Sequence, residues 1–283
     1  MLNHAVLLFV LVALLCAGLA FAQPARAAEG NAAGQQPFPG KKSVYHGCER
    51  YDFTVAQRAV LVVTPRQPAL GKPWVWRAEF FDAFPAFGLA MLEKGYHLVY
   101  MDVQNMYGGP EAMKLFDALY AAMTGQYGLS KKPILEGLSR GGLFVFNWAA
   151  RHPESAGCVL GDGAVCDFKS WPEGKGKGKG SPGDWQRLMQ VYGFKDEAEA
   201  LAYKLNPVDN LEPLAKAKVP LVMVTGDADE AVPYDENTLV VKERYEKLGG
   251  AIKVFIKPGG KHHPHGLPDP TPVVGFILEH AGN

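Results

Sequence analysis

The stretch LEGLSRGGLFVFNWAARHP, residues 135–153, decides the fold that the rest of the sequence must accommodate. It places Ser139 between Gly137 and Gly141, after an apolar approach and before a helix-like apolar run that stops at Pro153. A serine on a strand–turn–helix corner is held in strained backbone geometry, and small residues on both sides relieve the crowding of the turn. The amino end of the helix that follows favours negative charge beside the serine. Ser139 is therefore a candidate nucleophile, although serine and glycine are also common at ordinary turns.

The composition indicates an ordinary globular protein with no nucleic-acid partner. The 29 basic and 29 acidic residues balance to a formal net charge of zero, whereas nucleic-acid binding usually leaves a basic footprint. Beyond the amino-terminal stretch the chain keeps Cys48, Cys158 and Cys166. This odd number leaves at least one thiol unpaired and allows one disulfide. Since no C-x-x-C spacing occurs, a zinc site built from cysteines is not expected.

The first 22 residues are typical of a secretory signal peptide. Residues 5–20 are almost unbroken apolar sequence, followed by an A-x-A cleavage pattern that ends at Ala22. Cleavage after Ala22 is favoured over a second site near Ala27, and an uncleaved anchor is the alternative because the run approaches spanning length. We predict a periplasmic or secreted protein with no stable membrane association after cleavage. Residues 23–40, rich in Ala, Gln, Pro and Gly, are predicted to be a disordered linker.

Residues 41–283 have the pattern of a single α/β domain. Short β-rich runs alternate with helical patterns, which predicts a doubly wound, mostly parallel sheet covered by helices on both faces. The predicted strands are residues 59–64, 74–78, 97–102, 134–137, 158–161, 221–225 and 252–256. The predicted helices are residues 82–94, 110–124, 141–152, 234–248 and 271–280.

An insertion at about residues 165–205 interrupts this alternation. It contains WPEGKGKGKGSPGDW, residues 171–185, in which Lys and Gly alternate. Such a low-complexity run is expected to be mobile, and an insertion after the carboxyl end of a strand usually lies over the ligand-binding edge of the sheet. We interpret it as a small lid whose lysines attract anionic substrates. A solvated surface loop without a role is the alternative.

A serine nucleophile at neutral pH needs a base, and the base needs an orienting acid. The run PLVMVTGDADEAVPYDEN, residues 220–237, is a strand pattern that ends in two aspartates, Asp227 and Asp229. The run IKPGGKHHPHGLPDPTP, residues 256–272, follows the last predicted strand and carries three histidines in four positions. Histidine clusters also bind zinc. We favour a catalytic histidine and expect no metal or cofactor, because no carboxylate or thiol follows at the usual ligand spacing.

These three segments, in the order serine, acid, histidine, resemble the α/β-hydrolase superfamily from about residue 59 to residue 281. The aspartate and histidine segments look most like bacterial secreted esterases and the catalytic domain of the prolyl oligopeptidase family. The resemblance implies a triad in which Ser139 is the nucleophile, Asp229 the acid and His262 the base. Asp227 is the competing acid, and the neighbours of His262 at positions 263 and 265, His263 and His265, remain possible bases.

The resemblance also implies an oxyanion hole, but the chain departs from the family pattern there. The loop WVWRAEFFDAF, residues 74–84, lacks the His-Gly that lipases carry, and Arg140 is larger than many residues found after the nucleophile. The backbone N–H of Arg140 is the first expected donor. The second is assigned to the neighbourhood of Ala78.

The triad implies acyl transfer through an acyl-serine, but it leaves the substrate open. We predict a carboxylic ester, with a carbohydrate-linked ester suggested by the tryptophans, of which Trp171 is the candidate contact and core packing the alternative. Arg77 is a candidate ligand for a substrate carboxylate, unless it pairs with an acidic neighbour such as Glu79. A prolyl-oligopeptidase-like peptidase is the first alternative, although the short segment before residue 59 leaves no room for a propeller. A non-catalytic binding protein on this scaffold is the second.

Overall fold

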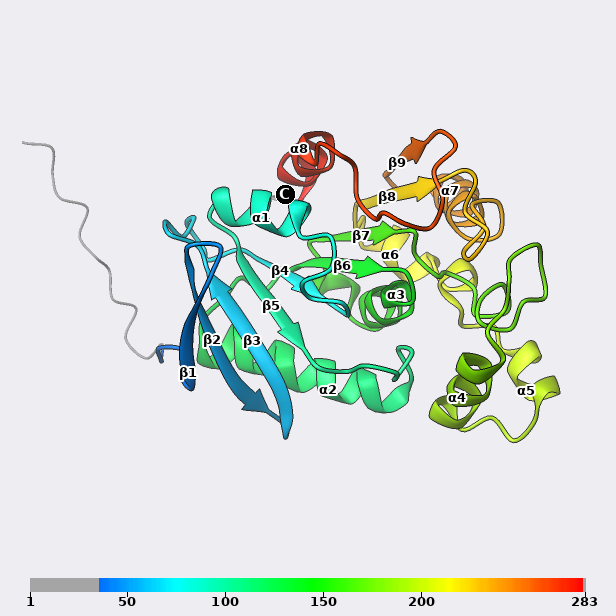
Figure 1. Cartoon of the computed structure of the whole chain (residues 1–283), viewed down its shortest axis with the longest axis horizontal. Coiled ribbons are helices and arrows are strands. Elements are labelled where there is room, and N and C mark those ends of the chain that lie inside the picture. The colour runs from blue at the N-terminus through cyan, green and yellow to red at the C-terminus, as the bar shows by residue number, and fades with distance from the viewer. Residues whose placement is uncertain (1–35, 282–283) are drawn as a thin grey trace, which may run out of the picture. The chain divides into compact units, whose positions relative to one another are not determined.

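Within residues 36–281, which the computed structural model describes, nine strands form one sheet (Figure 1). Its order is β1-β2-β3-β5-β4-β6-β7-β8-β9, with antiparallel pairing from β1 to β5 and parallel pairing from β5 to β9. The strands are β1 (Lys41–Tyr45), β2 (Cys48–Val55), β3 (Arg58–Thr64), β4 (Trp74–Arg77), β5 (His97–Met101), β6 (Ile134–Leu138), β7 (Cys158–Asp162), β8 (Leu221–Gly226) and β9 (Ile252–Lys257). The predicted fold class, an α/β protein with a mostly parallel sheet, is confirmed.

The central strands are apolar on both sides because both faces of the sheet are buried. In β8, Leu221 and Met223 belong to the larger hydrophobic cluster, whereas Val222 and Val224 belong to a second cluster. This alternation follows from the two-residue period of a strand. Each strand of a sheet that is covered on both faces is therefore a continuous apolar run in the sequence, and these strands were predicted from such runs.

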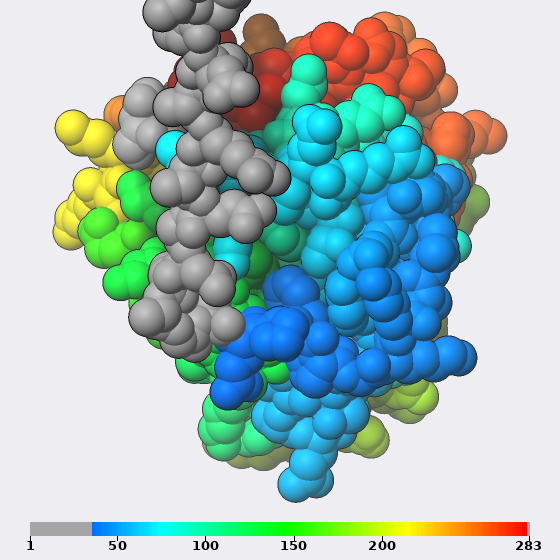
Figure 2. Space-filling model, turned by 90° about the vertical axis from the view of Figure 1, so that its left-hand side faces the viewer, coloured from blue at the N-terminus to red at the C-terminus, as the bar shows by residue number. Residues whose placement is uncertain are grey.

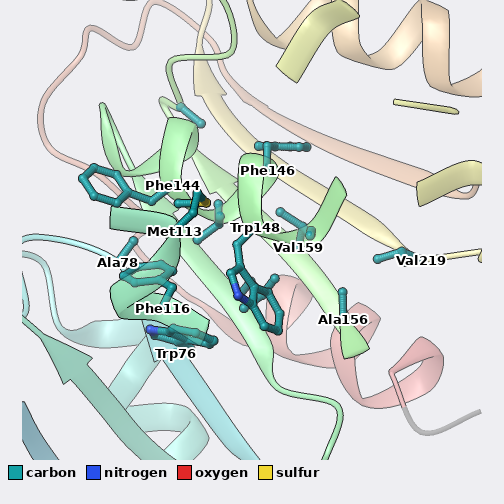
Figure 3. Close-up of a cluster of buried hydrophobic side chains, with 14 of the residues drawn as sticks. Trp76, Ala78, Met113, Phe116, Phe144, Phe146, Trp148, Ala156, Val159 and Val219 are labelled. Carbon is teal, nitrogen blue, oxygen red and sulfur yellow. The ribbon is translucent and has the colours of Figure 1, made fainter. Parts of the chain in front are cut away.

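Helices from both halves of the chain cover the two faces (Figure 1). Helices α1 (Ala86–Glu93) and α8 (Thr271–His280) pack on one face, and their buried side chains share a cluster. Helices α2 (Pro110–Ala121), α3 (Gly141–Arg151), α6 (Glu212–Lys216) and α7 (Thr238–Lys247) contribute to the cluster on the other face. Figure 3 shows that Trp76, Phe116 and Trp148 lie together in the cluster on this other face. The five predicted helices and seven predicted strands are present, with ends shifted by a few residues.

Two strands and three helices were not predicted. Strands β1 and β2 have only partly buried, mostly polar sequences, KKSVY and CERYDFTV, so they lack the apolar run of the central strands. Helices α4 (Pro182–Tyr192) and α5 (Glu197–Ala202) lie within the predicted insertion, and the short α6 follows it. The insertion is thus a small helical layer with its own apolar cluster around Phe168 and Trp185.

The Lys-Gly run of the insertion packs against the loop that follows β8. The ammonium groups of Lys177 and Lys179 pair with Asp235 and with Glu230, and the backbone N–H of Lys177 also bonds to Glu236. An added Cβ at position 178 would lie only 2.8 Å from Cδ of Pro233. The run thus has defined contacts in this structure, and its attraction of anionic substrates stays a prediction.

The amino-terminal predictions lie mostly outside the described residues. The predicted signal peptide and residues 23–35 of the predicted linker lie outside the described residues. Residues 36–40 contact the domain, since the Gln36 N–H donates to Gln126 and the Phe38 ring packs 4.9 Å from that of Tyr127. The domain therefore begins before residue 41. No helix in the described part has the length and apolarity needed to cross a membrane, and Cys48, Cys158 and Cys166 are free thiols there.

The sheet has two lysine-bearing edges. One edge is β1, which lies at the surface beside β2 in the blue region of Figure 2 and carries Lys41 and Lys42. The opposite edge is β9, whose sequence IKVFIK carries Lys253 and Lys257. Among the described residues, each edge strand has a sheet partner on one side only.

Candidate active site

Ser139 occupies the strained corner that its sequence context predicts. It follows β6 and precedes α3, and its φ of 49° lies in the left-handed region that non-glycine residues rarely adopt. Its N–H donates to the Asp162 carbonyl at 2.9 Å, and its carbonyl accepts from Val165 N–H at 2.9 Å. These bonds to the end of β7 and the loop beyond it hold the corner in place, since strained residues persist only where their surroundings fix them.

The glycines around Ser139 differ in how strictly they are required. A Cβ on Gly137 would lie 2.6 Å from the Gly141 carbonyl oxygen, so no side chain fits there. A Cβ on Gly141 would meet nothing closer than 3.8 Å, whereas one on Gly142 would lie 2.7 Å from the Val165 carbonyl oxygen. The expected need for small residues at both positions is thus confirmed at Gly137, while the crowded helix position is Gly142.

Ser139, His262 and Asp229 form a continuous hydrogen-bonded chain. His262 Nε2 lies 3.0 Å from Ser139 Oγ, and His262 Nδ1 lies 2.7 Å from Asp229 Oδ2. A carboxylate only accepts, so Nδ1 donates to Asp229 and Nε2 is left to accept the proton of the serine hydroxyl. The three residues follow β6, β8 and β9, whose carboxyl ends meet at one edge of the sheet.

The hydrogen bonds of the two aspartates separate their roles. Asp229 is buried, and its Oδ1 accepts the N–H groups of Ala231 and Val232 at 2.9 and 2.8 Å. Burial alone would raise the pKa of Asp229, but the bonds from His262 and from these N–H groups outweigh it and lower the pKa. The carboxylate of Asp227 instead accepts from Gly259 N–H at 2.6 Å. The geometry therefore brings Asp229, and not Asp227, to the histidine.

The other two histidines lie beside His262 without reaching the serine. The rings of His263 and His265 have centroids 4.8 Å from that of His262. His263 is exposed and packs on Phe84, while His265 is buried and its Nδ1 lies 3.2 Å from Asp162 Oδ1. Burial lowers the pKa of His263, and the neighbouring imidazoles lower it further. Of the three candidates, the structure places His262 in contact with the nucleophile.

The backbone at Arg140 matches its predicted place in an oxyanion hole, but that at Ala78 does not. Within residues 36–281 the N–H of Arg140 has no hydrogen-bond partner, so it is available to a ligand oxygen beside Ser139. The N–H of Ala78 donates to the Glu136 carbonyl at 3.0 Å, as the last bond of the β4–β6 ladder. The assignment of Ala78 is therefore corrected. The next residue, Glu79, has its N–H unbonded in the same part of the chain and becomes the candidate second donor.

The side chain of Arg140 joins the nucleophile corner to the insertion. Its Nε lies 2.7 Å from Glu79 Oε2, and its Nη1 lies 3.6 Å from Asp184 of α4. The guanidinium also lies 5.3 Å from the ring centroids of both Phe80 and Tyr107. Burial raises the pKa of Glu79, and the pairing with Arg140 opposes that rise. A large residue after the nucleophile is thus accommodated because it is held by two carboxylates and two rings.

Comparison with protein families gives a match to the prolyl oligopeptidase family over residues 94–273. The chain belongs to this family. The matched region contains Ser139, Asp229 and His262, so the hydrogen-bonded chain described above lies inside the family domain of a serine hydrolase. Comparison with curated protein sequences gave no match.

Solved structures with the same fold include peptidases and an esterase. Porphyromonas gingivalis dipeptidyl peptidase 4 is 14% identical with a TM-score of 0.61, over 84% of this chain and 36% of that one. A puromycin-hydrolyzing peptidase of Mycobacterium tuberculosis is 13% identical with a TM-score of 0.62, over 85% of this chain and 40% of that one. Acetyl xylan esterase 1 of Thermoanaerobacterium sp. JW/SL YS485 is 16% identical with a TM-score of 0.59, over 86% of this chain and 87% of that one. The chain thus spans less than half of either peptidase.

Arg77 is a buried structural residue in this family member. Its Nη1 lies 3.2 Å from Glu136 Oε1, and its other nitrogens donate to the carbonyl oxygens of Glu79 and Ala83. Its side chain is 5% exposed, so it has no free face for a substrate. The expectation of a carboxylate-binding Arg77 is corrected in favour of pairing with an acidic neighbour, which is Glu136.

Arg77→Met is expected to destabilise the protein by about 3 kcal/mol, because it leaves the Glu136 carboxylate buried without its partner. Denaturant unfolding measures this loss. The double variant Arg77→Met/Glu136→Met is the matched control and should recover most of the stability, since replacing both members of a buried pair is often neutral. If Arg77→Met instead raises KM and leaves the stability unchanged, Arg77 contacts the substrate.

The tryptophans divide between the core and the insertion. Trp74 and Trp76 are fully buried and stack on one another, which is the core-packing alternative. Trp185 is buried in the insertion, and Trp171 is partly exposed against the same cluster. Of the four, Trp171 is the one that is partly exposed and can offer part of its ring to a substrate.

Proposed function

We propose that this protein hydrolyses a carboxylic ester through an acyl-serine intermediate, with Ser139, His262 and Asp229 as the triad. The observation that carries the proposal is the hydrogen-bonded chain, with 3.0 Å between Ser139 Oγ and His262 Nε2 and 2.7 Å between His262 Nδ1 and Asp229 Oδ2. Membership in a serine hydrolase family supports the same chemistry.

Each step follows from where these atoms lie. His262 Nε2 takes the proton of Ser139 as its Oγ attacks the acyl carbon, and Asp229 stabilises the imidazolium that forms. The N–H of Arg140, with that of Glu79 as the candidate second donor, stabilises the negative charge that develops on the acyl oxygen. His262 then gives its proton to the departing alcohol. Water then loses a proton to His262 as it attacks the acyl carbon, and His262 returns this proton to Ser139 Oγ when the acid leaves.

One solved structure with this fold is an acetyl xylan esterase, which supports an ester as the proposed substrate class. The fold covers 87% of the acetyl xylan esterase but only 36% and 40% of the two peptidases. The fold thus accounts for nearly all of that esterase, whereas most of each peptidase lies outside it. We further propose a short acyl group on a carbohydrate, with Trp171 as the stacking surface. A periplasmic or secreted location, a small-molecule ester substrate and the absence of a cofactor are part of the same proposal.

The peptidase reading is the second candidate because the family includes peptidases by description. A paired assay separates the two activities: p-nitrophenyl acetate for the ester, and aminoacyl p-nitroanilides with free and blocked amino termini for the peptide bond. We expect kcat/KM to be at least about tenfold higher for the ester than for any anilide, after correction for the reactivity of the two bonds in water. Faster anilide cleavage would make the protein a peptidase. If neither substrate is hydrolysed and a fluorophosphonate does not label the protein, a non-catalytic binding protein on this scaffold is favoured.

A further inference from the structure

The three histidines of the loop after β9 form a compact cluster whose members are not all needed for the triad. His262, His263 and His265 each offer a ring nitrogen, and these atoms all lie within 4.8 Å of one another. The three ring pairs meet nearly at right angles, at 86°, 76° and 84°, with centroids 4.8 to 5.0 Å apart. The three rings are therefore not stacked on one another, and each offers one ring nitrogen near those of the other two.

The chemistry and spacing of the donors suit zinc. Three imidazole ligands with an open fourth position are a known zinc arrangement, and Zn–N bonds of about 2.0 Å in a tetrahedron separate the nitrogens by about 3.3 Å. The cluster has to close by about 1.5 Å from its 4.8 Å spread to reach this geometry. His263 is exposed, and within residues 36–281 its ring contacts are with Phe84 and the other two histidines, so it is the member with the most room to move.

Two of the histidines already have the carboxylate hydrogen-bond partners that metal-ligating histidines often use. His262 Nδ1 bonds to Asp229, and His265 Nδ1 lies 3.2 Å from Asp162, whose other oxygen accepts from Gly266 N–H. A carboxylate on Nδ1 fixes the ring and leaves Nε2 as the ligand atom. Both carboxylates also lower the electrostatic cost of a divalent cation beside them.

We propose that His262, His263 and His265 bind one Zn²⁺ ion and that this ion blocks the nucleophile. His262 Nε2 has one lone pair, which accepts from Ser139 Oγ at 3.0 Å in the metal-free arrangement. Coordination of that lone pair to Zn²⁺ leaves the serine without a base. Zinc binding rests on the cluster alone, whereas the block rests on the proposed serine hydrolase activity.

Zinc binding is tested by titration calorimetry on protein purified without a polyhistidine tag. We expect one ion per wild-type chain, and His263→Gln should weaken binding at least about tenfold, the lower end of what altered metal sites lose. His46→Gln and Cys48→Ser are matched controls, because His46 and Cys48 carry an imidazole and a thiol that line one cavity and do not belong to the cluster. Both controls should bind zinc as wild type does. Unchanged affinity in His263→Gln, or a loss in either control, would overturn the site.

A second readout separates zinc binding from catalysis and guards against misfolded variants. Co²⁺ bound to His263→Gln should lack the visible absorption of a tetrahedral ion that wild type shows, at matched circular dichroism. Zn²⁺ should slow both ester hydrolysis and fluorophosphonate labelling of Ser139 in wild type, and excess chelator should restore both. His263→Gln should need at least about tenfold more Zn²⁺ for the same fractional inhibition. Tight zinc binding that leaves labelling unchanged would overturn the block, and an inactive wild type that binds zinc would refute only the proposed function.

Discussion

Ser139→Ala is expected to lower kcat at least about a thousandfold on any ester that the wild type hydrolyses, while the protein stays folded. Without Oγ the acyl-enzyme cannot form, and only binding and the oxyanion donors are left to act. Steady-state hydrolysis of p-nitrophenyl acetate measures the loss. Equal unfolding midpoints for the two proteins would show that it does not come from misfolding.

Two features of the corner sharpen this experiment. Alanine lacks the polar group of serine but keeps its Cβ, so the strain at φ 49° is the same in both proteins. A fluorophosphonate should label wild type at Ser139 alone and leave Ser139→Ala unlabelled. Hydrolysis retained by the variant, or labelling at another serine, would refute the triad assignment.

His262→Gln is expected to lower kcat by a similar factor, whereas His263→Gln and His265→Gln should lose only a modest fraction. His262 alone contacts both Ser139 and Asp229, and loss of the base leaves the serine protonated. The three variants are compared by kcat in chelator-treated buffer, which removes the contribution of any bound metal. Full activity in all three would place the base elsewhere, and losses that appear only when metal is removed would point to a metal-dependent enzyme.

His265→Gln serves as the internal control for structural damage. His265 is buried against Asp162, so its replacement disturbs the same loop without removing the base. A loss of kcat in His262→Gln that far exceeds the loss in His265→Gln therefore reports on proton transfer. Equal losses in both would mean that the loop position, rather than the base, limits the reaction.

The sequence predicts most of the catalytic chain because its local signals are strong. Ser139 lies between glycines, of which Gly137 tolerates no Cβ, so the turn leaves a clear pattern. Asp229 and His262 follow apolar strands whose carboxyl ends meet in a parallel sheet, and the resemblance to α/β-hydrolases selects them from their neighbours. The geometry gives the physical reason, since Asp227 is bonded to the Gly259 turn instead.

The residues that were misplaced depend on contacts between distant segments. Ala78 follows the end of β4, but its N–H is taken by Glu136, a ladder bond from a strand 58 positions away. An ion pair of Arg77 with an acidic neighbour was one of the two interpretations of its sequence. The sequence does not show that the partner is Glu136 and not Glu79. The run was expected to be mobile, and the carboxylates that contact Lys177 and Lys179 lie beyond β8. Local patterns carry none of this information.

The lysines at the two sheet edges bear on how copies of the protein behave when they meet. An edge strand exposes unpaired backbone N–H and C=O groups that can extend a sheet into a second molecule, and charged side chains oppose this. Lys41 and Lys42 lie on β1, and Lys253 and Lys257 lie on β9, where Ile256 is 44% exposed. Edge-to-edge approach of two copies through β9 therefore brings like charges together, whereas at β1 the ammonium of Lys42 lies 2.5 Å from a carboxylate oxygen of Glu49, which weakens the repulsion there. We therefore expect charge to oppose extension of the sheet into a second copy, more strongly at β9 than at β1, and this opposition should weaken as salt screens the lysines.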